Sequence, residues 1–112
     1  MTVVVEPGQM VNPDIVQAQI MSSVVYGMSV ALNNEITLDK GRVLQTNFND
    51  YTAFRMYETP VIDIVLVRST ENRGGVGEPA TALVAPALAN ALFADTGKRV
   101  RTLPLHANLL KA

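Results

Sequence analysis

Apolar residues recur every three or four positions through a long stretch near the N-terminus, and this spacing predicts a helix from Pro13 to about Leu32. Asn12 comes just before the stretch and is a good N-cap, because its side chain can accept a hydrogen bond from a free backbone N–H. Proline suits the first helical position, and the carboxylate of Asp14 suits the positive end of the helix dipole. The start of this helix is therefore marked in the sequence.

A second apolar stretch predicts a helix from about Ala80 to Thr96. Pro86 lies inside it and should break or kink it, because the proline ring clashes with the preceding turn. The well-formed part would then run from Pro86 to Asp95. Gly97 follows as a suitable C-terminal stop, since glycine readily adopts the left-handed conformation that ends many helices.

Shorter apolar runs predict strands. Residues 3–5 are a brief candidate, and residues 61–67 are the strongest, being apolar on both faces like a covered central strand. Two alternating runs between residues 35 and 48, on either side of Gly41, predict a β-hairpin. Residues 98–103 are expected to form a last strand.

These elements predict an α+β fold in which two apolar helices pack on a small, mostly antiparallel sheet. The sheet would be built from residues 35–48, 61–67 and 98–103, within a single domain that spans residues 1–112. Residues 49–60 are expected to be irregular, with four large side chains packing into the domain: Tyr51, Phe54, Met56 and Tyr57.

Charge is sparse and unevenly placed. Charged residues make up 17% of the chain, against about 25% in typical domains. None lies between Asp14 and Glu35 or between Glu78 and Asp95, although a surface helix normally carries charge on its solvent face. A membrane span is disfavoured, because polar residues dilute the first helix and a proline interrupts the second. We therefore expect a partner subunit, a second copy or a larger parent chain to cover both helices.

Composition excludes several classes of function. The chain has no cysteine, so it can form neither a disulfide nor a thiolate metal site, and its one histidine makes a histidine metal site or a catalytic triad unlikely. A net charge of −1 gives no electrostatic footprint for nucleic acid. The 48% share of apolar residues excludes disorder. The first residues show no signal-peptide pattern, and the sequence does not determine the cellular compartment.

The loop Gly-Gly-Val-Gly-Glu-Pro at residues 74–79 has the richest candidate chemistry. Three glycines within four residues let backbone N–H groups approach a ligand closely. The sequence from Gly75 to Ala80 formally fits the dinucleotide fingerprint, so nucleotide binding is an alternative. The fit is poor, because seven residues separate Val67 from Gly75 and the fingerprint needs a tight turn directly after a strand.

Two polar side chains stand out beside uncharged stretches. Glu78 is a lone carboxylate followed by sixteen uncharged residues, and it could act as a general base or simply favour the first turn of a helix. Gln19 lies in the first uncharged helix, where a buried amide would need hydrogen-bond partners, and it could pair with the backbone. His106 lies in the C-terminal tail and is expected to be solvated.

Several separate motifs then give a resemblance to a known family. The segment from Val11 to Ile20, with Asn-Pro followed by Gln19, resembles a helix of the molybdenum hydroxylases, the xanthine dehydrogenase and aldehyde oxidase family. Residues 74–79 with 85–91 resemble that family's C-terminal Gly-x-Gly-Glu segment. Residues 47–56 and 96–105 resemble isoquinoline 1-oxidoreductase β-subunit-like members. The resemblance covers about residues 8–105, with the motifs in the right order.

The resemblance implies a function and assigns residues to it. The family's large subunit binds a molybdenum–molybdopterin cofactor and hydroxylates an aldehyde or N-heterocycle with oxygen from water. Glu78 matches the family's catalytic glutamate, a general base, and Gln19 matches a glutamine that contacts the cofactor. Gly77 would let the loop approach the metal centre. The implied partners are the remainder of the large subunit or a partner chain, and an iron–sulfur subunit in the complete enzyme.

The length departs from the family pattern, because the family's large subunits are several times longer. We therefore expect a C-terminal fragment, a piece of a split gene or one chain of a nicked enzyme, inactive and without molybdopterin when isolated. The alternative is a non-enzymatic interaction domain that retains the fold and forms a homo-oligomer through its uncharged helices.

Overall fold

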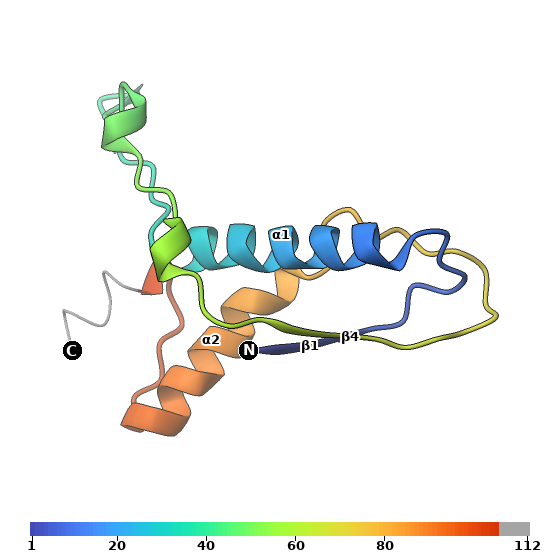
Figure 1. Cartoon of the computed structure of the whole chain (residues 1–112). Helices are drawn as coiled ribbons and strands as arrows, with labels where there is room; N and C mark the ends of the chain where they lie inside the picture. The colour runs from blue at the N-terminus through green and yellow to red at the C-terminus, as the bar shows by residue number, and fades with distance from the viewer. Residues whose placement is uncertain (106–112) are drawn as a thin grey trace.

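Two helices and a pair of short strands form the body of the molecule. The computed structural model describes residues 1–105 (Figure 1). Helix α1 is Pro13–Leu32 and helix α2 is Thr81–Thr96, and they cross in contact. Strands β1, Thr2–Val5, and β4, Asp63–Leu66, lie side by side along α1. The fold is mixed α and β with two helices and a small sheet, as predicted.

Helix α1 begins and ends as its sequence indicates. The Asn12 side-chain oxygen accepts hydrogen bonds from the backbone N–H groups of Asp14 and Ile15, at 3.1 and 3.2 Å. At the other end the Asn33 N–H bonds to the Ser29 carbonyl. One face of the helix supplies most of the hydrophobic core, with side chains at helical spacing: Val16, Ile20, Val24 and Met28.

Helix α2 runs continuously through Pro86, so the proline does not break it. Gly97 ends the helix as predicted, with a φ of 70° and its N–H bonded to the Phe93 carbonyl at 2.8 Å. Within the described chain Val84 is the one buried residue of α2. This helix is therefore covered on one side only.

The two helices approach most closely at Gly27. A β-carbon built there would lie 2.9 Å from the carbonyl oxygen of Thr81 and 2.9 Å from the Cβ of Val84. Such distances are well inside ordinary van der Waals contact. The absence of a side chain at Gly27 is thus what lets the first turn of α2 sit against the middle of α1.

The sheet of the body is parallel, which corrects the expectation of a mostly antiparallel sheet. Thr2 pairs with Asp63 and Val5 with Leu66 in a two-stranded register. Helix α1 lies between the two strands in sequence, and a connection through a helix returns the chain in the same direction, whereas antiparallel neighbours are usually joined by a tight turn. The inward side chains pack against the core: Val3, Val5, Ile64 and Leu66.

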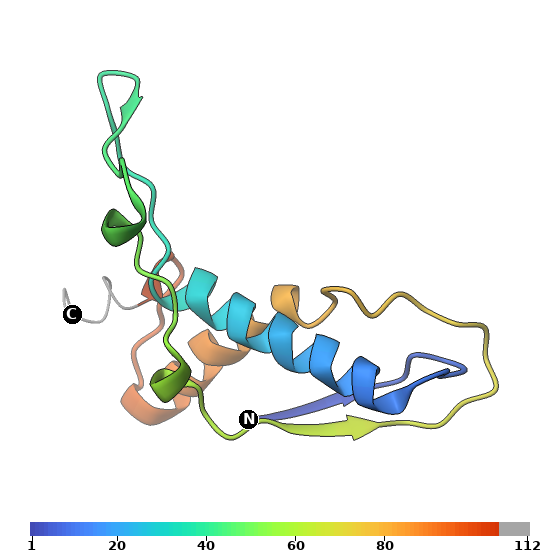
Figure 2. The ribbon, with the colours of Figure 1, turned by 45° about the horizontal axis from the view of Figure 1, so that its top comes forward.

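The predicted hairpin forms but is short and lies outside that sheet. Strands β2, Leu38–Asp39, and β3, Arg42–Val43, pair antiparallel around Lys40 and Gly41, both with positive φ. They belong to an arm, residues 35–58, whose hairpin extends away from the two helices and whose last residues return beside the body (Figure 2). Two single-turn 3₁₀ helices, Phe48–Asp50 and Met56–Glu58, complete it.

The arm is attached near the end of α1 by Phe54, whose N–H donates to the Ser29 hydroxyl at 3.1 Å. Phe54 also packs against the core as predicted. Met56 and Tyr57 do not, since their exposed fractions are 92% and 87%. The prediction that these two pack was wrong because the described chain places no element over this part of the arm.

Residues 98–103 form no strand, which corrects a second expectation. The guanidinium of Arg99 lies over the ring of Phe93 at 3.9 Å. This cation–π contact joins the start of the segment to the last turns of α2. His106 lies outside the described residues.

Much apolar surface remains uncovered. The chain exposes 8090 Å², whereas a compact 12.1 kDa protein exposes about 6,000 Å². On the outer face of the sheet, the directly paired side chains of Val4 and Val65 are exposed.

By length and composition alone α1 could cross a membrane. In this structure it is the core helix, in contact with α2 and β4.

Candidate functional site

The glycine-rich loop is held against α1 by one buried hydroxyl. Ser23 is fully buried, and its Oγ donates to the Gln19 carbonyl at 2.9 Å and lies 3.3 Å from the Gly77 carbonyl oxygen. The loop returns along α1 before α2 begins (Figure 1). Two of the residues predicted for the site, Gln19 and Gly77, are thus brought together although 58 positions separate them.

The carboxylate of Glu78 has a partner on the first turn of α2. Thr81 Oγ1 lies 2.9 Å from Glu78 Oε2 and 3.2 Å from the carbonyl oxygen of Ser23. The hydroxyl groups of Ser23 and Thr81 therefore link α1, the glycine-rich loop and α2. The third predicted residue, Glu78, sits at this junction.

Gln19 and Glu78 are both exposed in this chain. The alternative in which a buried Gln19 amide pairs with the backbone does not occur. The Gln19 backbone carbonyl accepts from Ser23 Oγ, while the side-chain amide makes no hydrogen bond within residues 1–105. Since only one side of α1 is packed, the Gln19 amide remains available to a group from outside.

The chain itself does not explain why the loop carries glycine. Gly75 and Gly77 lack a positive φ, and a β-carbon at either would meet nothing within 4 Å. Gly8 is the opposite case, with φ of +72° and the Asn72 carbonyl carbon 2.8 Å from the β-carbon position. Open space therefore lies beside the loop, where glycine would let a large group approach the backbone.

This arrangement offers hydrogen-bonding groups rather than metal ligands. Residues 1–105 contain no cluster of three or more histidine, cysteine, aspartate or glutamate side chains able to hold a metal ion. They do present loop peptide groups, the Gln19 amide and the Glu78 carboxylate. This set fits an organic cofactor bound through hydrogen bonds and does not fit a metal held directly by the protein.

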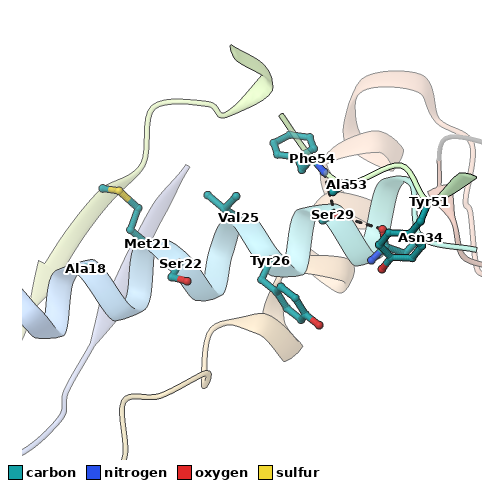
Figure 3. Close-up of a pocket in the computed structure, with 10 residues that line it drawn as sticks. All are labelled: Ala18, Met21, Ser22, Val25, Tyr26, Ser29, Asn34, Tyr51, Ala53 and Phe54. Carbon is teal, nitrogen blue, oxygen red and sulfur yellow. Dashed lines mark hydrogen bonds between the residues drawn. The ribbon is translucent and has the colours of Figure 1, made fainter. Parts of the chain in front are cut away.

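A separate hollow lies where α1 meets the arm (Figure 3). Its volume is about 550 Å³. Its lining is mostly apolar and includes Met21 and Val25 of α1 with Phe54 of the arm. The predicted site residues do not line this hollow, so it is distinct from the junction at Ser23.

Sequence reasoning missed Ser23 and Thr81. The available signals were local: Ser23 lies one helical turn after Gln19, and Thr81 lies three residues after Glu78. Neither spacing indicates that the two residues meet.

Comparison with known proteins places the chain in a family. The sequence profile described as "Molybdopterin cofactor-binding domain" matches residues 1–60, a stretch that includes Gln19 but not Gly77 or Glu78. Two curated relatives extend the match to 94% of the chain. They are the membrane-bound aldehyde dehydrogenase (pyrroloquinoline-quinone) of Gluconacetobacter polyoxogenes, 37% identical, and the isoquinoline 1-oxidoreductase subunit beta of Brevundimonas diminuta, 36% identical.

The fold agrees with these matches. The crystal structure of quinoline 2-oxidoreductase from Pseudomonas putida 86 superposes with a TM-score of 0.87 at 23% identity, over 98% of this chain and 15% of the other. The chain spans only 14% and 13% of the two curated relatives. The family expected from the motifs is confirmed: the chain belongs to the molybdopterin cofactor-binding domain family of molybdenum hydroxylase large subunits.

Proposed function

We propose that the chain is the C-terminal catalytic segment of a molybdenum hydroxylase, with Glu78 as its general base. The observation that carries this proposal is the junction at Ser23, which sets a lone carboxylate and a glycine loop beside Gln19, with open space in front. A carboxylate is a suitable base because, when ionised, it only accepts protons and hydrogen bonds.

In this proposal the cofactor lies in the open space beside the loop. The Gln19 amide and the backbone at Gly77 would hold it by hydrogen bonds, and glycine at position 77 keeps the approach clear. When bound, the molybdenum–molybdopterin group supplies the redox chemistry of hydroxylation. Glu78 takes up the proton that is released as water-derived oxygen is transferred to an aldehyde or N-heterocycle.

The remainder of the large subunit would cover the exposed apolar surface. Helix α1 carries no charge from residue 15 to its end, yet Ile15 and Tyr26 are exposed by 59% and 61%. The excess of about 2,000 Å² over a compact chain is larger than the roughly 800 Å² that each partner buries in a standard protein interface. The isolated chain would therefore be inactive, and the complete enzyme would add an iron–sulfur subunit.

The test is a chimera in which this chain replaces the matching segment of the Brevundimonas diminuta isoquinoline 1-oxidoreductase subunit beta. Glu78→Gln should abolish isoquinoline turnover while the molybdenum content of the purified protein stays unchanged. Glu71→Gln, at an exposed glutamate earlier in the same loop, is the matched control and should keep turnover. Turnover retained by Glu78→Gln would remove Glu78 from the role of base.

A second candidate is a non-enzymatic domain that self-associates. The uncovered sheet face and the apolar exposed face of α1 favour it, because a second copy could bury them. Sedimentation of the isolated chain measures its oligomeric state and so distinguishes a self-associating domain from the enzymatic segment. A stable dimer would support the self-associating domain, and a well-behaved monomer would argue against it.

A further inference from the structure

We propose that Ser23 and Thr81 are positioning residues that hold the Glu78 carboxylate in place for its role as base. This inference rests on the proposed function of Glu78 and adds two residues that act through it. The evidence is the geometry of two hydroxyls at the junction between α1, the glycine loop and α2. Each hydroxyl has one proton and two carbonyl or carboxylate oxygens within 3.3 Å.

Glu78 is held at two points. Ser23 Oγ lies 3.3 Å from the carbonyl oxygen of Gly77, which fixes the peptide just before Glu78. Thr81 Oγ1 lies 2.9 Å from Glu78 Oε2, which fixes the carboxylate itself. An exposed glutamate side chain otherwise samples several rotamers, so a second contact point narrows the directions in which its carboxylate can face.

The support behind these contacts is rigid. Ser23 is fully buried on the core face of α1, and the Thr81 hydroxyl oxygen lies 3.2 Å from the Ser23 carbonyl oxygen, in contact with the same helix. The close approach at Gly27 places the Thr81 backbone directly against α1. The donor to Glu78 is therefore anchored on a packed helix and not on the loop.

The threonine hydroxyl has one proton and two acceptors. It can donate to Glu78 Oε2 or to the Ser23 carbonyl oxygen, and a charged carboxylate is the stronger acceptor. The Thr81 hydroxyl therefore donates to Glu78 Oε2, and this bond sets the direction in which the carboxylate faces.

The experiment uses the chimeric enzyme with Thr81→Val, which removes the hydroxyl and keeps the shape, and Thr81→Ser, which restores the hydroxyl. The matched control is Thr96→Val, because the Thr96 hydroxyl donates to the Leu92 carbonyl at the other end of the same helix. Thr81→Val should lower kcat by about twofold to tenfold, with KM and molybdenum content unchanged. Thr81→Ser and Thr96→Val should keep the parent kcat.

A second readout needs no cofactor. In the isolated chain, the carbon-13 chemical shift of the Glu78 carboxyl group should move in Thr81→Val and stay in place in Thr96→Val. Ser23→Ala should move it in the same direction, because it frees the Gly77 peptide. Circular dichroism of each variant checks that the helices are retained.

The outcomes separate the two proposals. If Glu78→Gln abolishes turnover while Thr81→Val leaves both kcat and the carboxyl shift unchanged, the positioning role is overturned and the base stands. Equal losses of kcat in Thr81→Val and Thr96→Val would also overturn it, since they would reflect helix stability alone. If Glu78→Gln keeps turnover, the base role falls and the positioning role falls with it.

Discussion

The contact at Gly27 allows a sharp test of the fold, through the substitution Gly27→Ala. The new β-carbon would lie 2.9 Å from the Thr81 carbonyl oxygen and 2.9 Å from the Cβ and Cγ2 of Val84. Carbon atoms normally approach to about 3.5–4.0 Å. The obstructing atoms are backbone and a stiff β-branched side chain, so α2 as a whole must shift.

Two opposing terms set the size of the effect. Alanine is favoured over glycine inside a helix by about 1 kcal/mol, and overpacking a tight contact costs about 1–3 kcal/mol. The free energy of unfolding should therefore change by between about zero and a loss of about 2 kcal/mol. In a domain of this size each 1 kcal/mol lowers Tm by about 4–8 °C.

The assay is thermal and urea unfolding of the chain followed by circular dichroism. Gly75→Ala is the matched control, because its β-carbon meets nothing within 4 Å and the residue has no positive φ. That control should keep or slightly raise Tm, since alanine narrows the unfolded ensemble. A Gly27→Ala chain that is more stable than the parent by about 1 kcal/mol, the full gain of alanine in a helix, would refute the close helix contact.

Three further predictions concern the loop, the arm and the exposed surface. Gly77→Ala should leave the stability of the isolated chain unchanged, because nothing lies near the position of the new β-carbon. In the chimera it should lower the molybdenum content, measured by mass spectrometry. Equal molybdenum contents in the variant and the parent would contradict this. In the arm, hydrogen bonds from the Thr46 backbone and hydroxyl, and then from the Asn47 backbone, hold the pKa of Asp50 below its ordinary value. The stabilisation of the arm by these hydrogen bonds is thus present above the unfolded-state pKa of Asp50 and is lost as the pH falls through its folded-state pKa. The amide proton of Thr46 should therefore lose protection from hydrogen exchange on acidification. Asp50→Asn should remove this pH dependence. The isolated chain should show no isoquinoline turnover with an artificial electron acceptor, and activity from it alone would show that the uncovered surface needs no partner.

Local signals in the sequence predicted the helices well. The Asn12 cap, the Gly97 stop and the spacing of Val16, Ile20 and Val24 act through neighbours within one or two turns, so they are readable without the fold. The predicted break at Pro86 was wrong, because a helix can lose one backbone hydrogen bond and continue when packing on one side holds it.

Pairing between distant segments was harder to predict. β-Strand character in residues 61–67 was clear, but the strand's partner is β1, about 60 residues earlier and joined through a helix. Alternation of apolar residues says which face is buried and not which strand lies alongside. The exposed side chains of Met56 and Tyr57 were misjudged for a related reason, since apolar character does not reveal whether the covering surface belongs to the same chain.

The candidate site was predicted only in part. Gln19, Gly77 and Glu78 came from motif resemblance, and the structure brings their backbones into one junction. Ser23 and Thr81 were missed because their contacts span more than fifty residues. A hydroxyl-bearing residue has no sequence signature until its partners are known.

A crystal structure of the cofactor-loaded chimera would test the central claim most directly, through the surroundings of residues 74–78. We predict that the space beside Gly75 and Gly77, open in the isolated chain, is filled by molybdopterin, with the Glu78 carboxylate facing it and still bonded to Thr81. A loop that remains in bulk solvent, with the cofactor bound elsewhere, would contradict it.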